Sequence, residues 1–158
     1  MSLQVPVGKQ RNFILEEPAR INLLTGSVRS TKTWAVNLKV LKDIVSLPDG
    51  NILFVGNTGT SLYRNVLSQI KDLVGKQNFE MRAGKKECEI FGRTVWIEGA
   101  DNVSSYKKIE GESLLMAYID EWSTIPESFT NMLLSRLSDH GARLYGTCNP
   151  ETPRHYIY

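Results

Sequence analysis

The sequence predicts an α/β domain with a mostly parallel central sheet flanked by helices. Short apolar runs alternate along the chain with longer segments in which apolar residues recur every three or four positions. Glycines, prolines and a Pro-Asp-Gly turn separate the two kinds of segment. Strands that alternate with helices are joined in parallel, with the helices on the faces of the sheet. A chain of 158 residues suits one such domain with a substantial core.

The first half of the chain is expected to alternate between helix and strand. In chain order, the pattern predicts a short helix that ends near Pro18, a strand over 21–25, a helix from Thr33 that stops before Pro48, and a strand over 52–55. The helix from Thr33 is amphipathic because its apolar residues follow helical spacing: Trp34, Leu38, Leu41, Ile44 and Val45.

The second half continues this alternation and adds a hairpin. The expected elements are a helix over 62–74 that ends at Gly75, strands over 89–91 and 94–97 linked by Gly92-Arg93, a strand over 114–119, a helix over 129–137, and a strand over 143–147. No internal repeat or low-complexity linker divides the chain, so one domain is expected.

Composition excludes several classes of protein. The longest apolar run, 114–119, is far shorter than a membrane span, and the first residues do not resemble a secretory leader, so we expect a cytoplasmic protein. The formal net charge of +2 is too small to identify a nucleic-acid binder. Two cysteines sixty residues apart and two isolated histidines match no zinc spacing, so Cys88 and Cys148 are expected to be buried free thiols. A serine hydrolase is disfavoured because no Gly-x-Ser-x-Gly motif occurs.

A phosphate-binding loop is predicted between the first strand and the helix that follows it. Backbone N–H groups and a helix N-terminus bind an anion in that setting, a lysine reaches the terminal phosphates, and a hydroxyl helps to hold Mg²⁺. The candidate residues are Gly26, Ser27, Val28, Arg29, Ser30, Thr31, Lys32 and Thr33. The usual pattern has glycine before the lysine, and the β-branched Thr31 would crowd the loop. A Ser/Thr-rich turn that caps the helix is the alternative.

Two acidic residues follow the most apolar predicted strand. Asp120 and Glu121 would lie at the carboxyl edge of the sheet, where open α/β folds bind ligands. In an ATPase, Asp120 would hold Mg²⁺ together with Thr33, and Glu121 would deprotonate the attacking water. The alternative is an acidic turn that caps the next helix.

A third polar segment, Gly146 to Pro150, lies at the end of the last predicted strand. Asn149 could sense the γ-phosphate or the catalytic water by hydrogen bonding, although a plain Asn-Pro turn is the better explanation of this segment taken alone. A phosphate loop, two acids and a polar sensor at three strand ends would nevertheless converge on one nucleotide.

These motifs together resemble the ATPase domain of phage large terminase subunits, the motors that package DNA into procapsids. The resemblance covers nearly the whole chain, and Thr31 is its one clear departure. Gln10, within Gly8-Lys9-Gln10, is similar to an adenine-contacting motif, and the phosphate loop resembles a Walker A motif with an internal arginine, Arg29. The other similar segments are Asn65-Val66-Leu67, Gly99 to Asn102, the Walker B pair Asp120-Glu121, Arg136-Leu137-Ser138, and the coupling motif with Thr147 and Asn149.

The resemblance implies a P-loop NTPase fold of the additional-strand, catalytic-glutamate type. It implies that residues 1–158 are an incomplete ATPase domain that uses ATP and Mg²⁺, and that a C-terminal nuclease domain and its activity are absent from this chain. It also implies Glu121 as the catalytic glutamate. Arg29 is a second candidate catalytic residue, because it could stabilise charge on the transferring phosphate, although a loop arginine is often only a solvated anchor. The implied partners are double-stranded DNA, the portal protein and the small terminase subunit, in a ring assembled on the procapsid in the host cytoplasm.

Two other functions remain open from the sequence. Thr31 is compatible with a nucleotide-binding or structural module that has lost turnover. Another P-loop enzyme, such as a helicase or a small-molecule kinase, would share the same motifs. The basic pair Lys107-Lys108 could act on a neighbouring subunit's nucleotide or on DNA phosphates, or be simply solvated.

Overall fold

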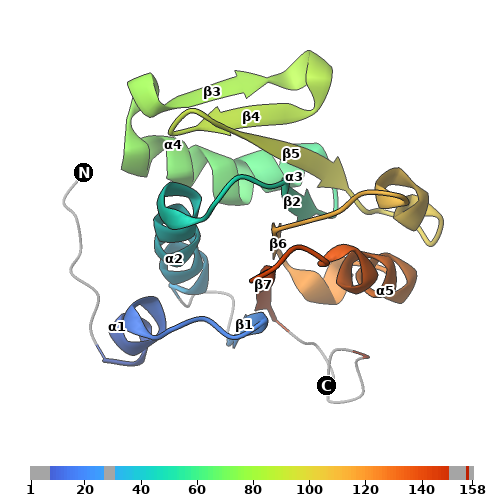
Figure 1. Cartoon of the computed structure of the whole chain (residues 1–158), viewed down its shortest axis with the longest axis horizontal. Helices are drawn as coiled ribbons and strands as arrows, with labels where there is room; N and C mark the ends of the chain where they lie inside the picture. The colour runs from blue at the N-terminus through green and yellow to red at the C-terminus, as the bar shows by residue number, and fades with distance from the viewer. Residues whose placement is uncertain (1–7, 27–30, 150–155, 157–158) are drawn as a thin grey trace.

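One mixed sheet organises the molecule (Figure 1). The computed structural model describes residues 8–26, 31–149 and 156. Within these residues the sheet has seven strands in the order β1-β7-β6-β2-β5-β4-β3. The strands are β1 (Ile21–Thr25), β2 (Ile52–Gly56), β3 (Phe79–Arg82), β4 (Glu87–Ile90), β5 (Arg93–Gly99), β6 (Met116–Ile119) and β7 (Arg143–Cys148).

The sheet has two parts, which we call the parallel half (β1, β7, β6, β2 and β5) and the β3–β4 hairpin. Strands β1, β7, β6, β2 and β5 run parallel, whereas β4 and β3 are antiparallel to their neighbours. Although β7 is the last strand in the chain, it lies between β1 and β6. This inserted strand is the feature that the additional-strand P-loop fold requires, and it confirms the predicted fold class.

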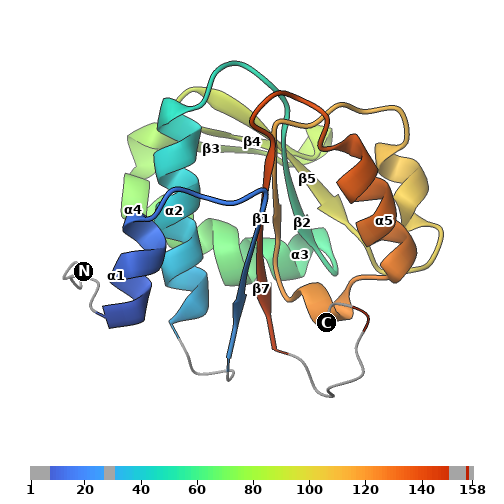
Figure 2. The ribbon, with the colours of Figure 1, turned by 60° about the horizontal axis from the view of Figure 1, so that its bottom comes forward.

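Helices cover both faces of the sheet (Figure 2). They are α1 (Gly8–Leu15), α2 (Lys32–Ser46), α3 (Gly59–Leu62), a π-helical turn (Tyr63–Leu67), α4 (Ser68–Val74) and α5 (Glu127–Arg136). Short 3₁₀ turns span Lys76–Asn78, Ala83–Lys85, Ser105–Ile109 and Trp122–Thr124. Helices α2 and α4 pack on one face and α5 on the other. No helix among the described residues is long and apolar enough to cross a bilayer.

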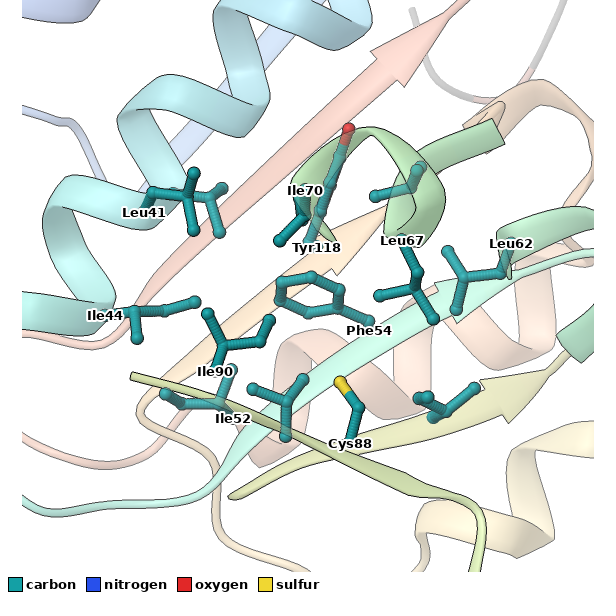
Figure 3. Packing of buried hydrophobic residues seen from close by; sticks show 14 of the residues in the cluster. Leu41, Ile44, Ile52, Phe54, Leu62, Leu67, Ile70, Cys88, Ile90 and Tyr118 are labelled. Carbon is teal, nitrogen blue, oxygen red and sulfur yellow. The ribbon is translucent and has the colours of Figure 1, made fainter. Parts of the chain in front are cut away.

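Alternate residues of the central strands fill two separate cores. On β2, Ile52 and Phe54 pack toward α2 and α4, whereas Leu53 and Val55 pack toward α5. In the first core, Phe54 meets Tyr118 of β6 edge to face, with ring centroids 5.2 Å apart (Figure 3). Because both faces are buried, the strands are almost wholly apolar, and this composition made them predictable.

Cys88 and Cys148 are buried free thiols, as predicted. Burial raises the pKa of the Cys88 thiol to about 12, and nearby Glu87 adds to this rise. The thiol is therefore protonated and unreactive at neutral pH.

The structure corrects the predicted hairpin of β4 and β5 and one predicted helix. Strand β3 was not predicted, and the turn between β4 and β5 is Phe91-Gly92 rather than Gly92-Arg93. Both turn residues have positive φ, 50° and 78°, which matches the right-handed twist of a two-residue hairpin. The helix predicted over 62–74 begins earlier, at Gly59, and contains the π-helical turn.

Candidate nucleotide-binding site

The predicted site residues meet at the carboxyl ends of three neighbouring strands. Lys32 begins α2 after β1, Asp120 and Glu121 follow β6, and Thr147 lies near the end of β7. Strand β7 joins the other two, since Thr147 is in register with Leu24 of β1 and the preceding residue pairs with the end of β6. Parallel pairing therefore brings these residues to one edge of the sheet.

Lys32 places a cation at this edge. Its Nζ donates hydrogen bonds to the carbonyl of Gly26, which follows β1, and to the carbonyl of Cys148 on β7, at 3.2 Å. Partial burial lowers the pKa of Lys32, whereas the charges of Cys148, Glu121 and Asp120 oppose this shift. The ammonium therefore shares one electrostatic site with both acids.

Asp120 is a buried carboxylate held from two sides. Only 4% of the residue is exposed. Asn65 Nδ2 donates to Asp120 Oδ2 at 3.3 Å, and Thr147 Oγ1 donates to Oδ1 at 3.2 Å. Burial raises the pKa of Asp120 and the neighbouring Glu121 adds to the rise, while the hydrogen bonds from Asn65 and Thr147 oppose it. The carboxylate is thus oriented by donors from two different elements.

Glu121 is exposed and has an unusual backbone conformation. Its φ and ψ are 47° and 59°, the left-handed region that side-chain-bearing residues seldom adopt. Its backbone N–H donates to Thr147 Oγ1 at 3.1 Å. The Thr147 hydroxyl therefore contacts both acids, accepting from one and donating to the other. Strain of this kind is concentrated at functional sites.

Trp122 anchors the segment that carries these acids. The indole is buried against β7, where a Cβ added to Gly146 would lie 2.6 Å from Trp122 Cε3. Its Nε1 donates to Thr130 Oγ1 of α5 at 2.9 Å, and Thr130 also bonds to the Tyr156 hydroxyl at 3.0 Å. Sequence reasoning placed Gly146 in the last candidate segment but missed its packing on Trp122, and it missed Thr130. A glycine within a buried strand was the available signal for the first, and nothing local indicated the second.

The remaining predicted residues are placed as follows. Thr33 lies in the first turn of α2 and is partly buried, and Asn149 directly follows β7. Thr31 precedes α2 with φ −79°, is exposed, and makes no side-chain capping hydrogen bond. Its negative φ shows that the backbone does not require glycine here. Gln10 belongs to α1, but its side chain lies outside the described residues, as do Ser27, Val28, Arg29 and Ser30.

The basic pair lies apart from these residues. Lys107 and Lys108 belong to the 3₁₀ turn before β6, and Lys108 Nζ donates to the Gly99 carbonyl at 2.7 Å. Lys108 also lines a cavity of about 720 Å³ at the ends of β2 and β5, together with Asn57, Lys86 and Glu98. Among the residues that the structure describes, no member of the predicted nucleotide site lines this cavity.

The donor set fits a magnesium–nucleotide complex. Asp120 and Thr33 offer a carboxylate and a hydroxyl, the oxygen ligands that Mg²⁺ prefers. Among the described residues, no group of three or more His, Cys, Asp or Glu side chains could hold a metal ion. Phosphate and water oxygens would therefore have to complete the coordination, as in sites where Mg²⁺ binds with its nucleotide.

Comparisons with known proteins identify the family and the fold. Residues 18–158 match the family model of the phage terminase large subunit. The structure of the large terminase from a thermophilic bacteriophage superposes with a TM-score of 0.82 at 26% identity, covering 97% of this chain and 41% of that one. A structure of the same phage's large terminase in complex with ADP gives 0.80 at 24% identity, covering 94% and 40%.

More distant structures share the fold. The large terminase of bacteriophage HK97 matches with a TM-score of 0.68 at 14% identity, covering 94% of this chain and 34% of that one. No curated protein sequence matches the chain. The chain spans 41% of the thermophilic phage's large terminase. Because the family model matches most of the sequence, the chain belongs to the phage terminase large subunit family.

Proposed function

We propose that this chain is the ATP-hydrolysing motor domain of a DNA-packaging terminase, coupling ATP hydrolysis to translocation of double-stranded DNA into a procapsid. The observation that carries the proposal is the meeting of Lys32, Asp120, Glu121 and Thr147 at the ends of β1, β6 and β7. Family membership supports it, as do structures of the thermophilic phage's large terminase in complex with ADP and with ATP-gamma-S.

Each residue would act on a different part of the nucleotide. Lys32 would leave the carbonyls of Gly26 and Cys148 and pair with the β- and γ-phosphates. Thr33 and Asp120 would hold Mg²⁺, which neutralises phosphate charge when bound. Glu121, exposed at the strand end, would accept a proton from the attacking water.

The other predicted residues complete the proposal. Thr147 and Asn149 would transmit the state of the nucleotide to β7, and Arg29 would stabilise charge on the transferring phosphate. The adenine and the phosphates would contact the remaining residues of the predicted set: Gln10, Gly26, Ser27, Val28, Ser30 and Thr31. We assign residues 1–158 to the ATPase domain, with no nuclease role.

The proposed partners follow from family membership. They are double-stranded DNA, the portal protein and the small terminase subunit, in a ring that assembles on the procapsid in the host cytoplasm. DNA-stimulated ATP hydrolysis by the full-length subunit tests the coupling to DNA. A full-length subunit whose hydrolysis and packaging are independent of each other would contradict it.

The direct test of the nucleotide site is Lys32→Ala. We expect this variant to remain folded and to lose ATP-γ-S binding, measured by calorimetric titration with Mg²⁺, because the phosphates lose their cation. Lys42→Ala is the matched control, since Lys42 lies on the same helix but is exposed outside the site. A folded Lys32→Ala chain that binds and hydrolyses ATP like the wild type would refute the proposal.

A further inference from the structure

Asn65 belongs to a π-helical turn that packs against the sheet beneath the site. The backbone N–H of Ser68 bonds to the carbonyl of Tyr63, five residues earlier, which widens the helix between α3 and α4. Apolar residues of the same segment are fully buried in the first core, and Figure 3 shows Leu62, Leu67 and Ile70 beside Phe54 and Tyr118. Single π-helical turns of this kind occur frequently at functional sites.

The side chain of Asn65 reaches the acid that the nucleotide site needs. Its Nδ2 lies 3.3 Å from Asp120 Oδ2, while Thr147 donates to the other carboxylate oxygen at 3.2 Å. Asn65 lies 55 residues before Asp120 in the chain, and Thr147 lies 27 residues after it. The backbone N–H of Glu121 also stabilises this carboxylate. A carboxylate held by several donors cannot rotate freely, yet its two oxygens offer about four lone-pair sites, so one remains for another partner.

We propose that Asn65 is a positioning residue for Asp120: it holds the carboxylate in the orientation that receives the Mg²⁺ of a bound nucleotide. This inference rests on the proposed function. An amide suits the role because it donates a hydrogen bond without carrying charge. A lysine or arginine at this position would neutralise Asp120 and compete with the metal, whereas asparagine leaves the full negative charge available.

The same helical segment supplies a control for a purely structural role. Gln69 of α4 accepts a hydrogen bond from Asn37 Nδ2 of α2, which ties the segment to a neighbouring helix without contacting Asp120. Val66 and Leu67 already bury this segment against the sheet. The Asn65–Asp120 hydrogen bond is therefore not needed to place the helix.

The test is the Mg²⁺ dependence of nucleotide binding by Asn65→Ala, Asn65→Leu and Gln69→Ala. The wild-type chain and each variant are titrated with a fluorescent ATP analogue at increasing Mg²⁺ and again in EDTA. For both Asn65 variants we expect the half-saturating Mg²⁺ concentration to rise roughly tenfold or more, the usual effect of removing a group that orients a metal ligand. Binding in EDTA should match the wild type, and Gln69→Ala should keep the wild-type Mg²⁺ dependence.

The outcomes separate this inference from the proposed function. A wild-type chain that binds no nucleotide at any Mg²⁺ concentration would overturn both. If the wild type binds and the Asn65 variants keep its Mg²⁺ dependence, only the positioning role fails. An equal shift in Gln69→Ala, or unfolding of both Asn65 variants while Gln69→Ala stays folded, would also overturn it, because the hydrogen bond would then serve the fold.

Discussion

The parallel half of the sheet and the β3–β4 hairpin use charged residues in opposite ways. In the parallel half, Lys32, Asp120 and Glu121 gather at strand ends, where each forms a hydrogen bond with a neighbouring element. In the hairpin, Arg82 of β3 forms ion pairs with Glu87, at 3.4 Å, and with Glu89, both from β4.

The difference follows from strand direction. Parallel strands end at a common edge, so polar residues that follow them converge on one ligand. Antiparallel neighbours place charges across from one another, where opposite charges pair on the surface. Because β3 is the edge of the sheet, its charges also discourage another chain from pairing with it. We therefore expect substitutions in the parallel half to change chemistry or stability strongly, and those in the hairpin to change little.

The largest effect is expected at the proposed base. Glu121→Gln should lower ATP hydrolysis by roughly two or more orders of magnitude, because the amide cannot accept the proton from water. The affinity for ATP with Mg²⁺ should stay close to that of the wild type. Asp120→Ala should instead weaken Mg²⁺-dependent binding. Steady-state hydrolysis and calorimetric titration separate the two, and identical binding losses would show that the roles are wrongly assigned.

Gly146→Ala should destabilise the parallel half by about 1–3 kcal/mol, the usual cost of overpacking. The new Cβ would approach Trp122 Cε3 to 2.6 Å, and the indole is held by its hydrogen bond to Thr130. Urea denaturation measures the change in free energy of unfolding. Gly59→Ala is the control, because a Cβ there has no neighbour within 4 Å. Equal stability of the two variants would mean that Trp122 can move away.

Thr31→Gly tests the departure from the usual phosphate loop. We expect tighter ATP binding, because the glycine removes a β-branched side chain from the loop. The free energy of unfolding without ligand should fall by up to about 1 kcal/mol, because glycine increases the freedom of the unfolded chain. Calorimetric titration of the wild type and Thr31→Gly with ATP and Mg²⁺ at one temperature compares their affinities. Equal or weaker binding would mean that Thr31 fits the phosphate site.

The smallest effect is expected in the hairpin. Arg82→Ala should lower the unfolding temperature only slightly, and less in high salt, because water and ions reach these partly exposed ion pairs and screen them. Arg143→Ala in the parallel half should cost more, since it removes a partner of the buried Asp43, at 3.2 Å. Thermal unfolding at two salt concentrations compares them. A larger loss for Arg82→Ala would contradict the distinction between the two regions.

The parallel half was also the more predictable region. Its strands are apolar runs bounded by glycine or by charged residues, and the helix after Thr33 has clear amphipathic spacing. Strand β3 alternates correctly, with Phe79 buried and Glu80 exposed, but four residues are too few to distinguish a strand from a loop. The Phe91-Gly92 turn was misplaced because a phenylalanine seldom adopts positive φ.

In the candidate site, too, some features could be predicted from the sequence and others could not. Lys32, Asp120 and Glu121 could be predicted because each follows a recognisable strand. The hydrogen bond from Asn65 to Asp120 joins residues 55 apart in the chain, and the packing of Trp122 on Gly146 depends on the order of β6 and β7. No local pattern encodes such contacts. They depend on the strand order, which in turn depends on how the whole chain packs.

The left-handed backbone at Glu121 means that the residue proposed for catalysis is not the one that would make the protein most stable. An ordinary side chain in this conformation costs about 1–2 kcal/mol, which glycine avoids. Glu121→Gly should therefore unfold at a higher temperature than Glu121→Gln, which keeps the strained backbone; an equal or lower temperature would show that the strain is negligible. A library of this protein selected for heat resistance alone would then enrich glycine at position 121. It would discard the proposed base, and only a parallel selection for ATP turnover would retain the glutamate.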